Sequence, residues 1–360
     1  MNCYIHVPFC AAKCGYCAFY SEPGCDPARY DRYLDHLETQ LRQAKLAGLS
    51  TLYVGGGTPT IFDAERLRRF VGILRDTLDF APGAELSIEA NPESLTPEKV
   101  EILREFFTRI SLGVQSFNAD FRRRIGRRCG DAALHAALEW VRQAGFPHWN
   151  CDLMYALPGQ NPDDWRSDLR LAAESGADHI SCYSLTPEPG SAMGAHFHTD
   201  DAVEAEMFQL AGAVLADRGL LRYEVSNYAR PGCECRHNIH VWRGEKLAGF
   251  GPSAADFDGQ VRHTEPASLD AWLAGEPPEA DVIPWPRRLN EIFAVNLRTV
   301  KGWSREMWAR LPGADSWEER RKIAENVQKI LPGTLTIAPE RIKLSDMGLL
   351  YWDDVAQVLL

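Results

Sequence analysis

Residues 4–19 read Tyr4-Ile5-His6-Val7-Pro8-Phe9-Cys10-Ala11-Ala12-Lys13-Cys14-Gly15-Tyr16-Cys17-Ala18-Phe19, an apolar run followed by three cysteines. Cys10, Cys14 and Cys17 are spaced as C-x3-C-x2-C. An iron-sulfur cluster normally takes four cysteine thiolates, so three close thiolates predict a cubane cluster with one iron that has no protein ligand. By the logic that separates catalytic from structural zinc sites, such an open iron can bind a further molecule.

The three cysteines have two other interpretations. Positions i, i+4 and i+7 also line one face of a helix, where cysteine behaves as a small buried apolar residue. Pro8 and Gly15 argue against a regular helix here. Zinc sites usually combine a C-x2-C pair with a distant second pair, which this spacing does not offer. The pattern therefore favours the cluster.

Outward from this stretch, apolar runs alternate with amphipathic segments. The strands are predicted at residues 3–7, 51–54, 85–90, 109–114, 150–155 and 180–185, and helices between them at 30–46, 64–78, 132–144 and 164–174. This alternation implies parallel strands with right-handed crossovers. Because the chemically unusual residues follow the carboxyl ends of the strands, we predict a partial TIM barrel, (β/α)6, that is open on one side.

The regular alternation stops near residue 220. We therefore predict three parts: the barrel at 1–222, an extension rich in aromatic and histidine residues at 223–284, and a small mainly helical, winged-helix-like module at 285–360. The proline-rich stretch 277–286 is interpreted as a linker. In the last part we expect helices at 288–300 and 317–331 and short strands at 335–337 and 341–344.

Composition limits the classes of partner. The 360 residues include 39 basic and 50 acidic side chains, a formal charge of -11, which disfavours nucleic acid and anionic membrane surfaces. The first residues lack the charged and apolar regions of an export signal, so we expect a cytoplasmic protein without an integral membrane segment. In that compartment the ten cysteines are expected to be free thiols or metal ligands.

Several motifs together resemble a known family. The cysteine loop resembles the radical S-adenosylmethionine superfamily, and the wider pattern resembles the oxygen-independent coproporphyrinogen III oxidase family. The motifs are Tyr4 to Cys10, Gly55-Gly56-Gly57-Thr58-Pro59-Thr60, Glu89-Ala90-Asn91-Pro92, Gly113-Val114-Gln115-Ser116-Phe117, Asp152 to Gln160 and Asn296-Leu297-Arg298. The resemblance implies a 4Fe-4S cluster whose free iron chelates S-adenosylmethionine. An electron delivered to the cluster would then cleave the sulfonium of S-adenosylmethionine and give a 5'-deoxyadenosyl radical.

The resemblance also implies roles for individual residues. Cys10, Cys14 and Cys17 would be the cluster ligands, and Gly56, Gly57 and Thr58 would meet the methionyl end of S-adenosylmethionine. The positions that would surround its nucleoside and carboxylate are Tyr4, Tyr16, Glu89, Gln115, Arg127 and Asp152.

Other features resemble the haem-chaperone branch of this family, HemW-type, which implies a protein that binds haem and passes it to acceptor proteins. The oxidases carry a longer segment before the first strand and a further cysteine where this chain has Phe19. The chaperone branch has a His-Asn-x-x-Tyr-Trp motif associated with haem. This chain has His237, Asn238 and Trp242 in that pattern, with Val241 in place of the tyrosine. These three residues are therefore the expected haem-binding residues, with His240, Cys233 and Cys235 as further candidate ligands of the haem iron.

Three readings of the function stay open at this point. As a haem chaperone, the protein would require haem, an apo-haemoprotein acceptor and a low-potential electron donor. As an enzyme, it would catalyse coproporphyrinogen III decarboxylation or a radical methylation. In the third reading, the barrel and the cluster serve only as a structural or dimerising element. Whether the chain forms a homodimer is left open by the sequence.

Overall fold

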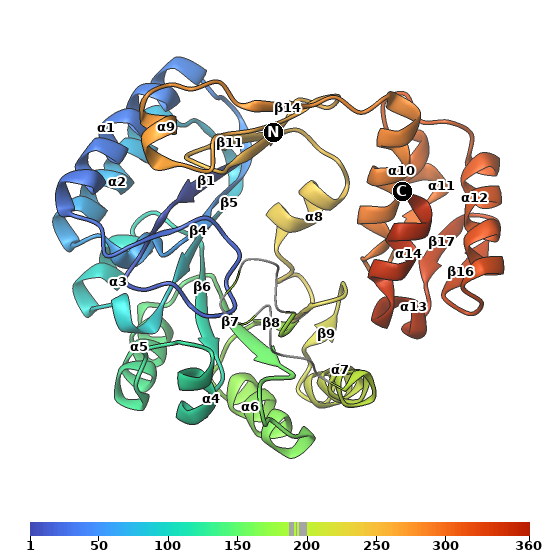
Figure 1. Ribbon diagram of the computed structural model, residues 1–360, viewed down its shortest axis with the longest axis horizontal. Helices are drawn as coiled ribbons and strands as arrows, with labels where there is room; N and C mark the ends of the chain where they lie inside the picture. Colours follow the sequence, from blue (N-terminus) through green and yellow to red (C-terminus); the bar gives the residue numbers. More distant parts are fainter. Residues whose placement is uncertain (187–190, 192, 194–199) are drawn as a thin grey trace.

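Six parallel strands form the centre of the molecule. The computed structural model describes residues 1–186, 191, 193 and 200–360. The strands, in the order in which they pair, are β1 (Asn2–Val7), β4 (Leu49–Gly56), β5 (Phe80–Ala90), β6 (Arg109–Gln115), β7 (His148–Tyr155) and β8 (His179–Ser184). Each pairs in parallel with the next, and the strands curve into an arc (Figure 1). The predicted partial (β/α)6 barrel is confirmed.

Helices cover the outer side of this arc (Figure 1). They are α1 (Pro27–Ala44), α2 (Ala64–Thr77), α3 (Pro97–Arg104), α4 (Ala119–Arg124), α5 (Asp131–Ala144), α6 (Pro162–Glu174) and α7 (Asp201–Ala216). All of them except α5 begin at a side-chain cap: at α2, for example, Asp63 accepts from the Arg66 amide, and at α6 Asn161 forms a capping box with Asp164. The apolar face of each helix is buried against the strands, as in α2 with Leu67, Phe70 and Leu74.

The sheet continues past both ends of the barrel. At one end β11 (Leu247–Phe250) pairs in parallel with β1 and is followed by antiparallel β12 (Ala255–Phe257), β13 (Arg262–Thr264) and β14 (Glu279–Asp281). At the other end β10 (Asn227–Ala229) and β9 (Leu221–Arg222) follow β8. The predicted part 223–284 thus shares a sheet with the barrel, and its boundaries stay a prediction.

The predicted linker at 277–286 is partly wrong. Residues Glu279–Asp281 form β14, because the edge of β13 offers unpaired backbone groups to the passing chain. Trp285 and Pro286 begin α10 (Trp285–Leu297), since proline is well tolerated in the first turn of a helix. The prolines therefore mark element boundaries within a structured connection.

The C-terminal module is mainly helical, as predicted, and lies to the right of the barrel in Figure 1. After α10 come β15 (Trp303–Ser304), α11 (Arg305–Ala309), α12 (Trp317–Ile330), β16 (Leu335–Ala338), β17 (Arg341–Leu344), α13 (Asp346–Leu350) and α14 (Trp352–Leu359). The sheet order β15-β17-β16 is that of a winged-helix module. Its core contains Phe293, Trp303 and Trp308, whose rings pack edge to face.

Helix α8 (Arg236–Trp242) was not predicted. It contacts β1 and β4 on one side and α10 on the other, between the barrel and the C-terminal module (Figure 1). It lies at the amino ends of the barrel strands, because its residue His237 bonds Thr51 near the start of β4. We call this end the barrel floor. Among the described residues, no helix is long and apolar enough to cross a membrane.

Candidate functional site

A cavity of about 640 Å³ occupies the barrel. At its outer end it is lined by the cysteine loop, and at its inner end by residues of the barrel floor. The predicted site residues that line it are Cys10, Cys14, Tyr16, Cys17, Gly56, Gly57, Thr58, Glu89, Gln115, Arg127, Asp152 and Asn238. The structure therefore brings together twelve of the fifteen residues that the sequence singled out; Tyr4, His237 and Trp242 are not part of the lining.

The cysteine loop is held at both ends and in its middle. Strand β2 (Phe9–Cys10) pairs with β3 (Glu22–Pro23), and the Gly24 amide donates to the Cys10 carbonyl over 3.1 Å. In the middle, the Gly15 amide donates to the Ile125 carbonyl over 3.1 Å. As expected, no regular helix forms across the three cysteines. Their separation is thus fixed by contacts with other segments.

The donor set fits an iron-sulfur cluster. All three thiols face one cavity, and none is in a disulfide. Burial raises the pKa of the Cys10 and Cys17 thiols, so a metal must displace their protons on binding. The Arg127 guanidinium lies 3.9 Å from the Cys14 sulfur, where it offsets negative charge on a thiolate. Three sulfur donors are soft ligands of the kind that iron-sulfur clusters use.

The glycine turn after β4 lies against the start of the cysteine loop. The Gly57 amide donates to the Val7 carbonyl over 2.8 Å, and the Thr58 amide to the Phe9 carbonyl over 2.7 Å. A Cβ at Gly57 would lie 2.6 Å from the Phe9 carbonyl oxygen, so only glycine fits. The Thr58 hydroxyl is 3.5 Å from the Cys10 sulfur. The turn therefore presents backbone groups beside the first cysteine.

Glu89, the residue before the last one of β5, lies on the cavity wall. Its carboxylate accepts from the Tyr53 hydroxyl over 2.9 Å and from the Gly56 amide over 3.2 Å. Burial, together with the negative charge of Asp152, raises the pKa of Glu89 to about 7. A carboxylate of this kind can accept a hydrogen bond from a bound ammonium group near neutral pH.

Gln115 and Arg127 lie next to this part of the wall, at the end of β6, the strand that pairs with β5. Gln115 ends β6 with a φ of 65°, an uncommon conformation for a residue other than glycine, at a point where the register with β7 shifts. Arg127 is buried and donates over 2.6 Å to both the Asn91 amide oxygen and the Gly113 carbonyl. Strained backbone and a buried cation beside a cavity are features of binding sites.

Asp152 lies deeper, in β7. It accepts hydrogen bonds from the Ser111 hydroxyl over 2.8 Å and from the Asn150 amide over 2.7 Å. Burial raises its pKa, and these hydrogen bonds oppose that rise. The carboxylate is thus held by neutral donors rather than by an ion pair.

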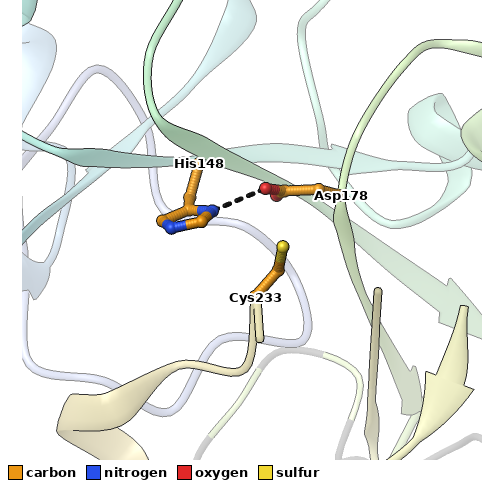
Figure 2. A group of neighbouring side chains, drawn as sticks. All are labelled: His148, Asp178 and Cys233. Atoms are coloured by element: carbon orange, nitrogen blue, oxygen red, sulfur yellow. Dashed lines mark hydrogen bonds and ion pairs between the residues drawn. The ribbon is translucent and has the colours of Figure 1, made fainter. Parts of the chain in front are cut away.

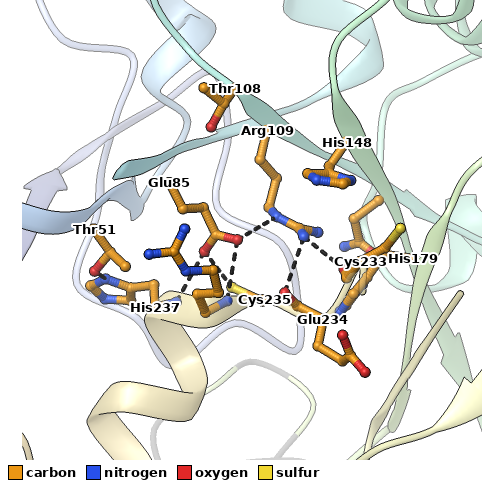
Figure 3. Close-up of polar contacts among 12 residues, drawn as sticks. Thr51, Glu85, Thr108, Arg109, His148, His179, Cys233, Glu234, Cys235 and His237 are labelled. Carbon is orange, nitrogen blue, oxygen red and sulfur yellow. Dashed lines mark hydrogen bonds and ion pairs between the residues drawn. The ribbon is translucent and has the colours of Figure 1, made fainter. Parts of the chain in front are cut away.

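Of the three predicted residues outside the cavity lining, His237 and Trp242 lie on α8 at the barrel floor. The buried His237 imidazole bonds the Thr51 hydroxyl over 2.8 Å, and its own amide donates to Glu85 over 3.0 Å (Figure 3). Trp242, at the end of α8, lies under the Arg298 guanidinium, which is 4.7 Å from its ring. Tyr4 bonds the His6 ring over 3.1 Å and stacks on Tyr53 behind the cavity wall.

Sequence reasoning missed several residues of the cavity. They are Tyr53, Asn91, Arg109, His179 and Tyr183. Asn91 lies within a quoted motif, and Tyr53 lies two positions before Gly55 of another. Arg109 lies six positions before Gln115, and His179 and Tyr183 lie four positions apart on β8. Alternation along a strand puts such residues on the same face, so this period is the signal that finds them.

Comparisons with known proteins agree with this geometry. A family model described as the radical SAM superfamily matches residues 4–172. The curated protein "Heme chaperone HemW" of Mycobacterium tuberculosis is 40% identical over 272 residues, 72% of this chain and 70% of that protein. The protein of the same name from Synechocystis is 30% identical over 345 residues, 89% of this chain and 82% of that protein.

The fold has a counterpart among solved structures. Coproporphyrinogen III oxidase (HemN) from Escherichia coli, described there as a radical SAM enzyme, matches with a TM-score of 0.83 at 21% identity. The match covers 99% of this chain and 89% of that one, so it includes the C-terminal module. With its cysteine loop, its barrel cavity and these relatives, the chain belongs to the radical SAM superfamily and, within it, to the family of the HemW heme chaperones.

Proposed function

We propose that the protein is a haem chaperone that holds a 4Fe-4S cluster and S-adenosylmethionine in the barrel cavity, binds haem and delivers it to an apo-haemoprotein. The observation that carries the proposal is the single cavity that joins three cysteine thiols to a polar wall, in a chain 40% identical to a curated haem chaperone. When bound, the cluster and the nucleotide supply one-electron chemistry at the sulfonium.

The chain's own residues have separate tasks in this proposal. Cys10, Cys14 and Cys17 hold the cluster and leave one iron without a protein ligand. The turn at Gly56 and Gly57 lines the cavity where the methionyl end would lie, and glycine lets this turn pack tightly against His6 and Phe9. The rest of S-adenosylmethionine is oriented and shielded from water by the polar wall of the cavity, which is formed by Glu89, Gln115, Arg127 and Asp152. The ring of Tyr16 lies beside these residues and the ring of Tyr4 behind them.

Haem is assigned to the α8 region, with His237, Asn238 and Trp242. Burial lowers the pKa of His237 to about 4, so its imidazole is neutral at pH 7, the form that binds haem iron. In the described structure the ring is buried and bonded to Thr51. Ligation through this imidazole therefore requires α8 to move away from the barrel floor.

The proposal includes partners and a compartment. A low-potential donor must supply the electron, and an apo-haemoprotein must accept the haem. The cytoplasm suits a protein whose ten cysteines are free thiols. Sedimentation of the cluster-bearing protein with and without haem shows whether a homodimer takes part.

Haem titration tests the proposal. Anaerobically reconstituted protein is expected to give a saturable Soret shift, and the bound haem is expected to pass to added apomyoglobin as a probe acceptor. His237→Ala is expected to weaken binding at least tenfold. The matched control is His135→Ala, an exposed histidine on α5. Iron content and circular dichroism of both variants show that they are folded. Non-saturable absorbance in the wild type, or equal binding by His237→Ala, contradicts the proposal.

A second function, oxidative decarboxylation of coproporphyrinogen III, is favoured by one observation. Arg109 lines the deep end of the cavity, and its Nη1 is buried without a hydrogen-bond partner among the described residues. A buried, unpaired guanidinium nitrogen suits a carboxylate-bearing guest. Conversion of coproporphyrinogen III to protoporphyrinogen IX by the reduced, nucleotide-loaded protein would establish this function, and its absence would leave the chaperone proposal alone.

A further inference from the structure

Three metal-ligating side chains from separate segments meet outside the cysteine cavity. His148 begins β7, Asp178 directly precedes β8, and Cys233 lies in the loop before α8. Figure 2 shows the three side chains pointing toward one another. Their ligand atoms all lie within 4.8 Å of one another. Among the described residues, this is the one group of three His, Cys, Asp or Glu side chains that meets so closely.

The group is held in place by the backbone. The His148 Nδ1 and Asp178 Oδ2 atoms are 2.6 Å apart, and the other Asp178 oxygen accepts from the Trp149 amide over 3.1 Å. The Cys233 amide donates to the Arg230 carbonyl over 2.9 Å, and the Arg230 amide donates to the Asp178 carbonyl over 2.9 Å. The loop that carries the thiol is therefore tied to the residue that carries the carboxylate.

The distances suit a small tetrahedral cation. Around Zn²⁺, neighbouring nitrogen, oxygen and sulfur ligands lie about 3.3–3.6 Å apart, given the usual bond lengths. Spreading the His148 and Asp178 atoms by less than about 1 Å and drawing in the Cys233 sulfur reaches this geometry. All three side chains are partly exposed, so a metal ion can enter from solvent.

The charges also balance. A thiolate, a carboxylate and a neutral imidazole together cancel the charge of a divalent cation. The nearby Arg109 guanidinium is turned to other partners: it pairs with Glu85 over 3.3 Å and donates to the Cys233 carbonyl over 2.7 Å. The charge of Arg109 is thus offset by Glu85, and its guanidinium bonds the Cys233 carbonyl rather than the Cys233 sulfur.

We propose that His148, Asp178 and Cys233 form a zinc site on the barrel floor, with a fourth position open to water. Nitrogen, oxygen and sulfur donors in one set are typical of zinc, and three protein ligands leave one position free. The ion would join the starts of β7 and β8 to the loop that leads into α8 (Figure 3). The site is independent of the proposed haem function.

Zinc retention tests the site. Anaerobically reconstituted protein, with its cluster cysteines occupied by iron, is incubated with Zn²⁺, desalted and analysed for metal by mass spectrometry. About one retained zinc per chain is expected. Cys233→Ser and Asp178→Asn are expected to weaken zinc binding at least tenfold, measured by competition with a chelating dye. Cys25→Ser is the matched control, because Cys25 is a partly buried free cysteine outside the group.

X-ray absorption at the zinc edge identifies the ligands directly. One sulfur and two or three nitrogen or oxygen neighbours support the site. Three sulfur neighbours would mean that zinc had entered the cysteine loop, and would overturn the proposal. Equal retention by wild type and Cys233→Ser, or none by the wild type, would overturn it as well. Iron content measured in the same samples shows that each variant is folded. If Asp178→Asn fails to fold, the test rests on Cys233→Ser, which replaces only a sulfur atom by oxygen.

Discussion

Glu85→Ala is expected to release α8 from the barrel floor. The buried Glu85 carboxylate pairs with Arg109 over 3.3 Å and accepts from the amides of Arg236 and His237 over 3.2 and 3.0 Å (Figure 3). The Glu85 and Arg109 side chains are only 5% and 3% exposed. Removing Glu85 leaves a buried guanidinium without its counter-charge and two helix-start amides without their acceptor.

The magnitude follows from this burial. Breaking a buried pair from one side costs about 3–5 kcal/mol of unfolding free energy. The control is Glu98→Ala, since Glu98 pairs with Arg68 over 2.7 Å but both side chains are more than half exposed. An exposed pair contributes at most about 1 kcal/mol.

The assay is urea unfolding of the cluster-bearing protein, followed by tryptophan fluorescence, with amide hydrogen exchange of α8 measured in parallel. Glu85→Ala is expected to lower the unfolding free energy by the stated amount and to speed exchange at Arg236 and His237. A loss as small as that of Glu98→Ala, with unchanged exchange in α8, would refute the reasoning.

Three further predictions concern the cavity and the floor. Gly57→Ala is expected to cost about 1–3 kcal/mol of unfolding free energy and to lower the iron content per chain, because the new Cβ meets the Phe9 backbone. The control is Gly72→Ala in α2, where the Cβ has open space, and it is expected to stabilise the protein by about 0.5–1 kcal/mol. Equal effects of the two substitutions would contradict this prediction. The pKa of Glu89 is raised to about 7, so the folded state holds this proton more tightly than the unfolded state does. The nucleotide-free protein is therefore expected to lose on the order of 3 kcal/mol of unfolding free energy as the pH rises from about 4.5 through 7. Unfolding measured at pH 5.5 and at pH 8 should show a loss in the wild type and none in Glu89→Gln. Because the pKa of His237 is lowered to about 4, its contribution to stability is expected above pH 6.5 and lost as pH falls toward 4; an unchanged acid slope in His237→Gln would contradict this.

The barrel could be predicted because its signals are local. Buried parallel strands read as short apolar runs, and the helices between them repeat at helical spacing. The cavity followed from the same reasoning, since the carboxyl ends of parallel strands meet on one rim and the cysteines, glycines and Glu89 lie there.

The barrel floor could not be predicted in this way. Helix α8 has only seven residues, and its position depends on the distant Glu85 and Thr51. His237 was selected by its motif, but the motif carries no information on burial, and the fold places the ring against Thr51. The group of His148, Asp178 and Cys233 has no sequence signal, because only the folded sheet brings its members together.

The central claim is that three cysteines hold a cluster with one open iron. Its most direct test is the EPR spectrum of the reduced, reconstituted protein before and after addition of S-adenosylmethionine. The account predicts about four irons and four sulfides per chain, a spectrum that changes when the nucleotide is added, and loss of the signal in Cys14→Ser but not in Cys25→Ser. A full complement of iron with a spectrum indifferent to the nucleotide, or a signal that survives in Cys14→Ser, would contradict it.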